Sequence, residues 1–166
     1  MERPKAKVYI DGANVFYTQK KLGWSFDWAK IKSEIAKTHE ILGWRYYVAY
    51  KEGDLKMQKY LKYIDALGFE AFTKKLKKIK IENSKFIFKA NFDVEIATDI
   101  LLNKTKINEI VLFSGDSDFE YLVKKLKDAG IRVVVWSSRK TISWELKLIA
   151  SRVVYFEDMQ DSIRRE

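Results

Sequence analysis

Cysteine is absent from the 166-residue chain, and histidine occurs only once, at His39. The protein therefore lacks disulfides and thiolate ligands for zinc, and a single histidine cannot build a histidine metal site. Any metal ion must be held by oxygen ligands, chiefly carboxylates. His39 lies near the end of an amphipathic segment, where we expect a favourable charge interaction with the helix end and no catalytic role.

Long apolar runs and linkers are absent as well. No segment approaches the ~18 apolar residues of a membrane-spanning helix, and the start "MERPKAKVYIDGANV" lacks the apolar core of a signal peptide. We therefore expect a cytoplasmic protein with no membrane partner. Pro4 is the only proline. Because the chain has the length of one typical domain, we expect a single domain over residues 1–166.

Positive charge is in excess, with 32 Lys and Arg against 23 Asp and Glu and a net charge of +9. This balance favours a polyanion or an anionic membrane surface as partner, although it can also serve solubility alone. Residues 51–89 contain eleven lysines and five acids, which leaves +6 in this segment. The positive field is therefore concentrated in about a quarter of the chain.

Short β-rich runs alternate with amphipathic helical patterns along most of the sequence. The expected strands are "KVYI", "WRYYVAYK", "EIVLFSG", "IRVVVW" and "RVVYF". Helices are predicted for "DWAKIKSEIAKT", for "DLKMQKYLKYIDALG", for "NFDVEIATDILL" with Ile96, Ala97, Ile100 and Leu101 inward, from Phe119 to a stop at Gly130, and from Thr141 to Ser151. This alternation predicts a three-layer α/β/α sandwich around a mainly parallel sheet.

The segment "KKLKKIKIENSKFIFKANFD" interrupts this alternation and predicts a lysine-rich hairpin or flap that turns at residues 82–84. Its lysines could follow an RNA backbone while Phe72, Phe86 and Phe88 stack on bases, as in single-strand binding. The other interpretation is a solvated lysine face over core aromatics. For Phe86 and Phe88 we expect the core, because one side of a hairpin is usually buried. The candidate RNA-binding lysines are Lys74, Lys75, Lys77, Lys78 and Lys80.

Asp11 and Asp116 each follow an expected strand, and Asp93 opens an expected helix. Since ligands of open α/β sheets bind at the carboxyl ends of strands, we expect these carboxylates to converge. Each ionised pair ~5 Å apart would repel by roughly 3 kcal/mol, which protonation or a divalent cation can offset. Oxygen ligands favour Mg²⁺ or Mn²⁺, ions that activate water against phosphodiesters.

Helix capping is the alternative explanation for several of these polar residues. Asp118 or Ser117 could cap the helix near Phe119, and for Asp118 capping and metal binding are equally open. We favour the metal for Asp116. Asn14 could cap a helix or orient Asp11, and Ser114 could contact phosphate or only close its turn. Asp99 is placed at the surface or behind the metal ligands, since it lies roughly 240° around the helix from Asp93.

The segments "YIDGANV", "NFDVEIATDIL", "LFSGDSDFEYLVKKLKDAGIRVVVW" and "SWELKLIASRVVYFEDM" together resemble the NYN domain family, the LabA-like branch of the PIN-like nucleases. The resemblance spans about Lys7 to Met159. It implies a PIN-like sandwich with a magnesium- or manganese-dependent ribonuclease site. Asp11 and Asn14 stand in the "DGxN" element, Asp93 in an aspartate-bearing helix start, and Asp116 with Asp118 in the "SGDSDF" turn.

The resulting hypothesis is a metal-dependent endoribonuclease that acts on single-stranded RNA. Its expected catalytic residues are Asp11, Asp93 and Asp116, its metal ligands are these three with Asp118, and its supporting residues are Asn14 and Ser114. The alternative is a catalytically weak RNA-binding or regulatory module that acts through partners. A haloacid-dehalogenase-type phosphatase fits less well, because its second aspartate would stand where this chain has Ala13. The oligomeric state stays open, a homodimer included.

Overall fold

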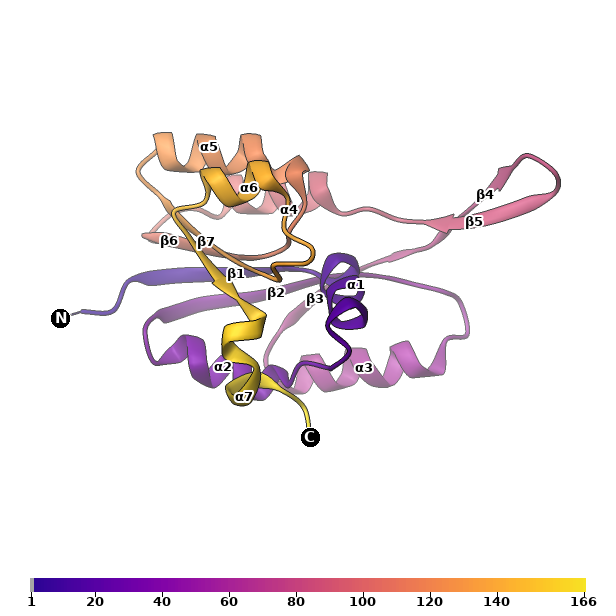
Figure 1. Ribbon diagram of the computed structural model, residues 1–166, viewed down its shortest axis with the longest axis horizontal. Helices are drawn as coiled ribbons and strands as arrows, with labels where there is room; N and C mark the ends of the chain where they lie inside the picture. The colour runs from indigo at the N-terminus through magenta and orange to yellow at the C-terminus, as the bar shows by residue number, and fades with distance from the viewer. Residues whose placement is uncertain (1) are drawn as a thin grey trace.

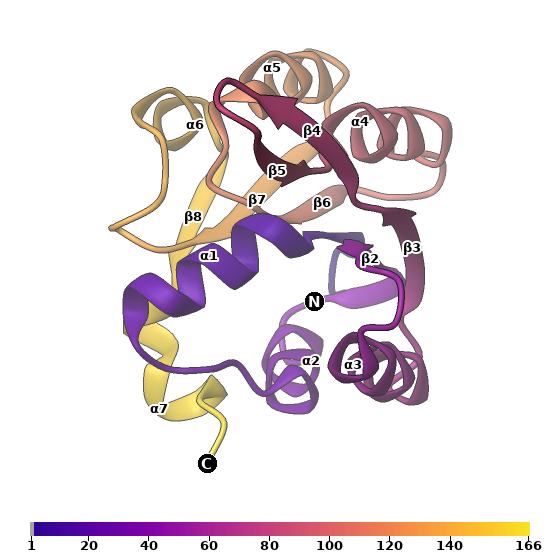
Figure 2. The same cartoon turned by 90° about the vertical axis from the view of Figure 1, so that its right-hand side faces the viewer.

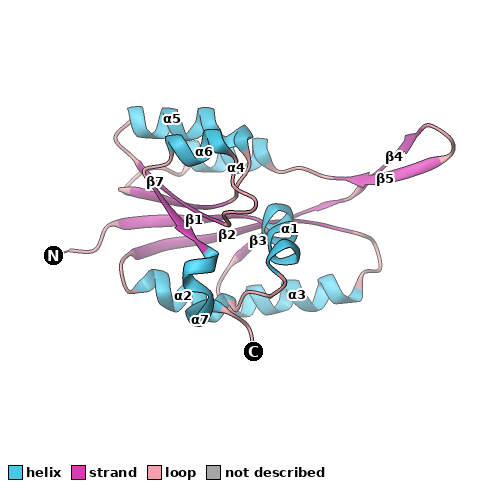
Figure 3. Ribbon diagram, in the orientation of Figure 1, coloured by secondary structure: helices cyan, strands magenta, loops and turns pink. Residues whose placement is uncertain are grey.

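A central six-stranded parallel sheet organises the computed structural model, which describes residues 2–166 (Figures 1 and 3). The strands of this sheet are β1 (Lys5–Asp11), β2 (Glu40–Tyr50), β3 (Glu70–Lys75), β6 (Glu109–Phe113), β7 (Arg132–Ser137) and β8 (Arg152–Tyr155). Their spatial order is β3-β2-β1-β6-β7-β8, and every neighbouring pair is parallel. The parallel sheet predicted from the sequence is confirmed.

Helices cover both faces of the sheet and make the three layers (Figure 1). One face carries α1 (Gly12–Leu22), α2 (Trp28–Ala36), α3 (Leu55–Ala66) and α7 (Gln160–Ile163), and the other carries α4 (Asp93–Leu102), α5 (Glu120–Asp128) and α6 (Trp144–Ile149). Alternate residues of β1 point to opposite faces, so Val8 and Ile10 join the first core while Tyr9 joins the second. Two short 3₁₀ helices, η1 (Ser117–Phe119) and η2 (Phe156–Met159), complete the connections.

The direction in which the sheet is built reverses beside β1. After β1 the chain adds β2 and β3 on one side, and it then returns through α4 to add β6, β7 and β8 on the other. The carboxyl ends of β1 and β6 therefore flank a topological switch point, the place where open α/β sheets bind their ligands. Figure 2 looks onto this edge of the sheet.

Among the predicted helices, one end is correct and two details need correction. Gly130 closes α5 with a φ of +79°, as its position after the helical pattern predicts. The helix predicted from Thr141 to Ser151 is shorter, because Ser143 caps α6 and Ala150 is extended. Leu101 is 45% exposed, since Ile96 and Ile100 already occupy the inward stripe of α4.

The lysine-rich segment forms a separate antiparallel hairpin of β4 (Lys77–Ile81) and β5 (Lys85–Lys89) that projects from the body (Figure 1). All residues from 77 to 89 are exposed. Phe86 and Phe88 are 48% and 46% exposed, so the expectation that they belong to the core is wrong. The alternation of a hairpin identifies its two faces, but here the body of the protein covers neither of them.

His39 has a different partner from the expected helix end. Its Nε2 contacts a carboxylate oxygen of the buried Glu109, at the start of β6. This pair lies at the amino-terminal edge of the sheet, opposite the switch point. No helix among residues 2–166 has both the length and the apolar character needed to cross a membrane.

Candidate functional site

Three aspartates gather at the switch point. Asp11 ends β1, Asp116 follows β6, and Asp93 is the first residue of α4. Each offers a carboxylate oxygen, and these oxygens lie within 4.8 Å of one another. We call Asp11, Asp93 and Asp116 the aspartate triad. The carboxylate of Asp118 does not belong to this group, and its side chain is exposed.

Asp11 is the most enclosed member of the triad, with 8% of its surface exposed. Its Oδ1 accepts a hydrogen bond from the backbone N–H of Asn14 (3.3 Å), and its Oδ2 accepts one from the Ser114 hydroxyl (3.1 Å). Burial raises the pKa of Asp11, the two hydrogen bonds oppose this change, and the nearby charge of Asp116 adds to it. Asp11 therefore both caps α1 and contributes a carboxylate oxygen to the triad.

Hydrogen bonds to α1, to the start of α6 and within the loop itself fix the loop after β6. The backbone N–H of Gly115 donates to Oδ1 of Asn14 (3.0 Å), and its carbonyl accepts from the N–H of Ser143 (2.8 Å). The hydroxyl of Ser114 accepts from the N–H of Asp116 (3.2 Å). These contacts tie α1, the loop after β6 and the start of α6 together around the triad.

The capping alternatives resolve differently from the sequence expectation. Asp116 caps η1, because its Oδ1 accepts from the N–H of Asp118 (3.0 Å). Asp118 is therefore the donor in this contact, through its backbone N–H, and its carboxylate caps neither η1 nor the α5 helix that follows. Asp93 does not cap α4 either, since Phe92 takes the N-cap position without a side-chain hydrogen bond.

Asn91 holds the carboxylate of Asp93, a role that the sequence analysis missed. Its Nδ2 donates to Oδ2 of Asp93 (2.6 Å), and its Oδ1 accepts from the N–H of Asp93 (3.1 Å). Burial raises the pKa of Asp93 to about 6, with further increases from the charges of Asp116 and Asp11, while the Asn91 contact opposes them. The sequence signal for this role is an asparagine two residues before an acid at the start of a helix.

The segment that carries Asp93 is anchored on both sides. The Lys74 amino group donates to the Asn91 carbonyl (2.9 Å), pairs with Glu95 and lies 4.8 Å from the Phe92 ring centre. Further along α4, Asp99 accepts from the Tyr47 hydroxyl (2.7 Å) and lies 3.4 Å from Arg45. Asp99 therefore fastens α4 to the sheet and does not reach the triad.

The electrostatics of the triad favour a cation. At ~4.8 Å and an effective dielectric of ~20, each ionised pair repels by roughly 3 kcal/mol. Among residues 2–166 no lysine or arginine forms an ion pair with a triad carboxylate. The donor set consists of oxygen alone and converges from three elements, so these residues fit a divalent metal ion and could hold one.

Comparison with known proteins agrees with this geometry. A model of the NYN domain matches residues 5–157. The low amplitude and bright protein LabA of Synechococcus elongatus is 31% identical over 162 residues, which cover 95% of this chain and 87% of that protein. The chain belongs to the NYN domain family. NYN domains are generally nuclease-like, and the relationship to LabA is consistent with a PIN-like nuclease fold.

A solved structure shares the fold of this NYN domain. It is a protein of unknown function from Vibrio parahaemolyticus, with a TM-score of 0.80, 22% sequence identity, and coverage of 98% of this chain and 99% of the other. At this level of identity the likeness supports the fold alone.

The basic part of this NYN domain lies along the same edge of the sheet. Lys77, Lys78 and Lys80 belong to the hairpin, and Lys78 lies 4.1 Å from the ring centre of Phe86. Lys75, at the end of β3, pairs with Glu52. Phe72 is partly buried and stacks on Tyr47, so it is unlike the exposed Phe86 and Phe88.

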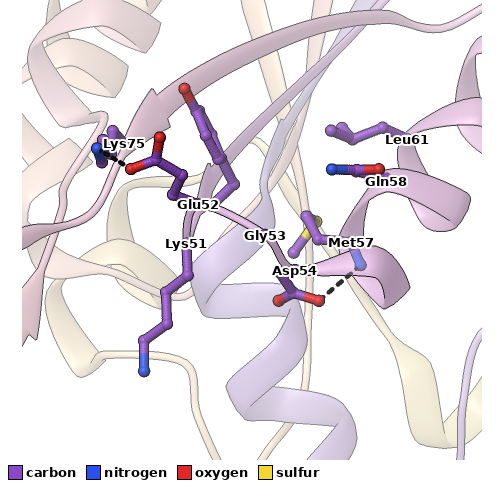
Figure 4. A pocket seen from close by; sticks show the side chains of 9 residues that line it. Lys51, Glu52, Gly53, Asp54, Met57, Gln58, Leu61 and Lys75 are labelled. Atoms are coloured by element: carbon purple, nitrogen blue, oxygen red, sulfur yellow. Dashed lines mark hydrogen bonds and ion pairs between the residues drawn. The ribbon is translucent and has the colours of Figure 1, made fainter.

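A pocket lies beside the base of the hairpin, between the end of β2, the start of α3 and Lys75 (Figure 4). Its carboxylates are already engaged, because Asp54 caps α3 through the N–H of Met57 (3.0 Å) and Glu52 pairs with Lys75. No triad residue lines this pocket. We therefore place the candidate site of this NYN domain at the triad.

Proposed function

We propose that the protein is a metal-dependent endoribonuclease that hydrolyses phosphodiester bonds of RNA at the aspartate triad. The observation that carries this proposal is the convergence of three carboxylates within 4.8 Å, from segments far apart in the chain. Among the described residues, no lysine or arginine forms an ion pair with any of these three carboxylates. Membership of a generally nuclease-like family supports the same conclusion.

The triad residues would bind the metal ion, with Mg²⁺ or Mn²⁺ as the expected species. When bound, such an ion stabilises negative charge that develops on the phosphodiester and makes water a better nucleophile near neutral pH. Ser114 and Asn14 hold the Asp11 carboxylate in a fixed orientation, and Asn91 does the same for Asp93. Asp118 lies outside the triad, and its charge adds to the rise in the pKa of Asp93.

The lysines at the same edge would bind the RNA backbone. Lys77, Lys78 and Lys80 carry charge on the hairpin, and Lys74 and Lys75 stand at its base. Because phosphate contacts release counterions, RNA affinity should fall steeply as the salt concentration rises. The substrate in this proposal is single-stranded RNA, whose bases are free to leave the stack.

Cleavage of end-labelled single-stranded RNA in Mg²⁺, Mn²⁺ or EDTA tests the proposal. We expect cleavage in either metal and none in EDTA. Asp116→Asn should reduce the rate at least about 100-fold, because it removes a ligand of an ion that contributes several kcal/mol to the transition state. Asp118→Asn, two residues away and exposed, is the matched control and should retain activity within about 10-fold.

Thermal unfolding supplies a readout that does not depend on turnover. Mn²⁺ at about 100 times its dissociation constant should stabilise the protein by about 2.7 kcal/mol, and Asp116→Asn should abolish this effect. Tight RNA binding without cleavage in any metal would instead identify a catalytically weak RNA-binding module. Absence of both metal stabilisation and cleavage would refute the nuclease proposal.

A further inference from the structure

The β4–β5 hairpin has two chemically different faces. Residues directly opposite each other in an antiparallel pair share a face. The register pairs Lys78 with Phe88 and Lys80 with Phe86, and these four residues form what we call the aromatic face. The register also pairs Ile79 with Ile87, Ile81 with Lys85 and Lys77 with Lys89. These six residues form the isoleucine face, which carries three lysines beside its isoleucines.

The aromatic face presents two half-exposed rings, each with a lysine ammonium group over it. Lys78 lies 4.1 Å from the ring centre of Phe86, and Lys51 lies 4.0 Å from that of Phe88. About half of each phenylalanine is exposed. A ligand that suits this surface has flat groups to stack on the rings and negative charge for the ammonium groups. An unpaired nucleic-acid strand provides both along its length.

Charge complementarity supports the same occupant. Residues 77–89 contain five lysines and one glutamate, a net charge of +4. A second copy of the chain would bring an equal positive hairpin to the contact, which disfavours pairing between hairpins. A polyanionic strand is attracted along the full length of the hairpin.

The hairpin stands next to the aspartate triad in the chain and in space. It projects from the edge of the sheet where β1 and β6 end (Figures 1 and 2). Asp93 follows Lys89, the last residue of β5, by four positions, so the chain between them spans at most roughly 14 Å. A strand of a few nucleotides can therefore lie on the hairpin and reach the triad.

We propose that the aromatic face holds unpaired nucleotides by stacking on Phe86 and Phe88, and that it makes the enzyme prefer single-stranded RNA. The inference rests on the proposed function for the nature of the strand. Paired bases in a duplex are already stacked and cannot lie on the two rings. A duplex therefore gains only the lysine contacts, whereas an unpaired strand gains stacking as well.

The test compares the two faces with substitutions that preserve hydrophobicity. The double variant Phe86→Leu/Phe88→Leu removes the rings, and Ile79→Leu/Ile87→Leu is the matched control on the opposite face. The binding of a fluorescein-labelled 12-nucleotide RNA, and of the same sequence as a duplex, is measured by anisotropy in EDTA. Circular dichroism checks that both variants fold.

We expect the phenylalanine variant to bind the single strand about 10-fold or more weakly, the loss expected when base–aromatic stacking disappears. Duplex affinity should change less than about 2-fold, and the isoleucine variant should bind both as the native protein does. Equal losses for single strand and duplex, or a loss confined to the isoleucine variant, would overturn the inference. So would hairpin-dependent binding to vesicles with anionic lipid through the isoleucine face.

Failure of this inference is distinguishable from failure of the proposed function. The binding measurement needs neither metal nor turnover. If the protein distinguishes single-stranded from duplex RNA through its phenylalanines but never cleaves RNA, only the nuclease proposal is contradicted. If the protein cleaves RNA but loss of the two phenylalanines leaves its binding of single strand and duplex unchanged, only the role of the aromatic face is contradicted.

Discussion

The aspartate triad and the β4–β5 hairpin stand at the same edge of the sheet, yet they are held in opposite ways. Hydrogen bonds from α1, the loop after β6 and the segment before α4 orient the carboxylates of Asp11 and Asp93. The hairpin is exposed at each of its residues and is joined by pairing between its own two strands. The triad concentrates negative charge, while the hairpin concentrates positive charge.

This difference separates two tasks that the proposed nuclease would have to perform. A metal site needs ligands whose positions do not change, because geometry decides affinity and reactivity. A surface that accepts many sequences of an unpaired strand needs accessible rings and charges, and tolerates motion. Rigidity and exposure are therefore expected to be distributed unequally along this edge, and substitutions should have very unequal effects on the two regions.

A substitution that disturbs the close packing beside the triad should cause the largest loss of stability. A Cβ atom at Gly115 would lie 2.5 Å from the carbonyl oxygen of Thr141 and 2.9 Å from Cα of Ile142. Both are backbone atoms that cannot move away independently. We expect Gly115→Ala to lower the free energy of unfolding by about 3 kcal/mol, near the upper end of the usual cost of overpacking. Chemical denaturation measures this value.

Gly43→Ala provides the control, because a Cβ there meets nothing closer than Lys7 Cγ at 3.9 Å. Its stability should stay within about 0.5 kcal/mol of the native protein. A Gly115→Ala variant as stable as Gly43→Ala would show that the loop around the triad is looser than its contacts indicate.

Repulsion among the crowded triad carboxylates should have a smaller effect on stability, and this effect depends on pH. The pKa of Asp93 is raised from 3.8 to about 6, chiefly by burial and then by Asp116 and Asp11. The folded protein therefore holds a proton between about pH 4 and pH 6 that the unfolded chain has released. The free energy of unfolding falls as the pH rises through this range, and the stabilisation that the bound proton provides is lost above it.

Asp93→Asn cannot ionise, so in EDTA it should be more stable than the native protein above pH 6. We expect roughly 1 kcal/mol, less than the full pKa shift would give, because Asp93 is only about half buried and solvent screens its charge. The advantage should vanish below about pH 4. Thermal unfolding across this range measures it, and a variant that is less stable at pH 7.5 would assign Asp93 a structural role.

The parts of the site that follow from topology were predictable, and those that depend on side-chain contacts were not. Asp11 and Asp116 end or follow parallel strands, so pattern recognition and the switch-point rule place them together. Asp93 reaches them because Lys74 and Asn91 hold the start of α4. These contacts involve a strand end and a loop, whose relative positions no local pattern encodes.

The exposure of both faces of the hairpin could not be predicted from the sequence, for a related reason. Alternation in "KIKIENSKFIF" correctly separates the phenylalanines from the isoleucines, since that depends only on the pleat. Which face is covered depends on whether the body of the protein reaches the hairpin. Leu101 illustrates the same limit in a helix, because one position beyond the inward stripe of α4 was enough to expose it.

The smallest effect is expected from Ile79→Thr with Ile87→Thr, on the isoleucine face. These two side chains are 40% and 43% exposed and oppose each other across the hairpin. Their pairing stabilises the hairpin by about 0.2–1 kcal/mol. Because the hairpin can open while the sheet stays folded, we expect the global free energy of unfolding to change by less than about 0.5 kcal/mol.

Hydrogen exchange distinguishes local from global opening in this double variant. Amides of β4 and β5 should exchange several times faster than in the native protein, while amides of β1 and β6 beside the triad keep their protection. Val135→Ala in the core strand β7 serves as the opposite control, because it should accelerate exchange throughout the sheet. A global loss above about 1 kcal/mol from the isoleucine changes would mean that the hairpin and the triad form one cooperative unit. The contrast between a rigid site and an independent binding surface would then be wrong.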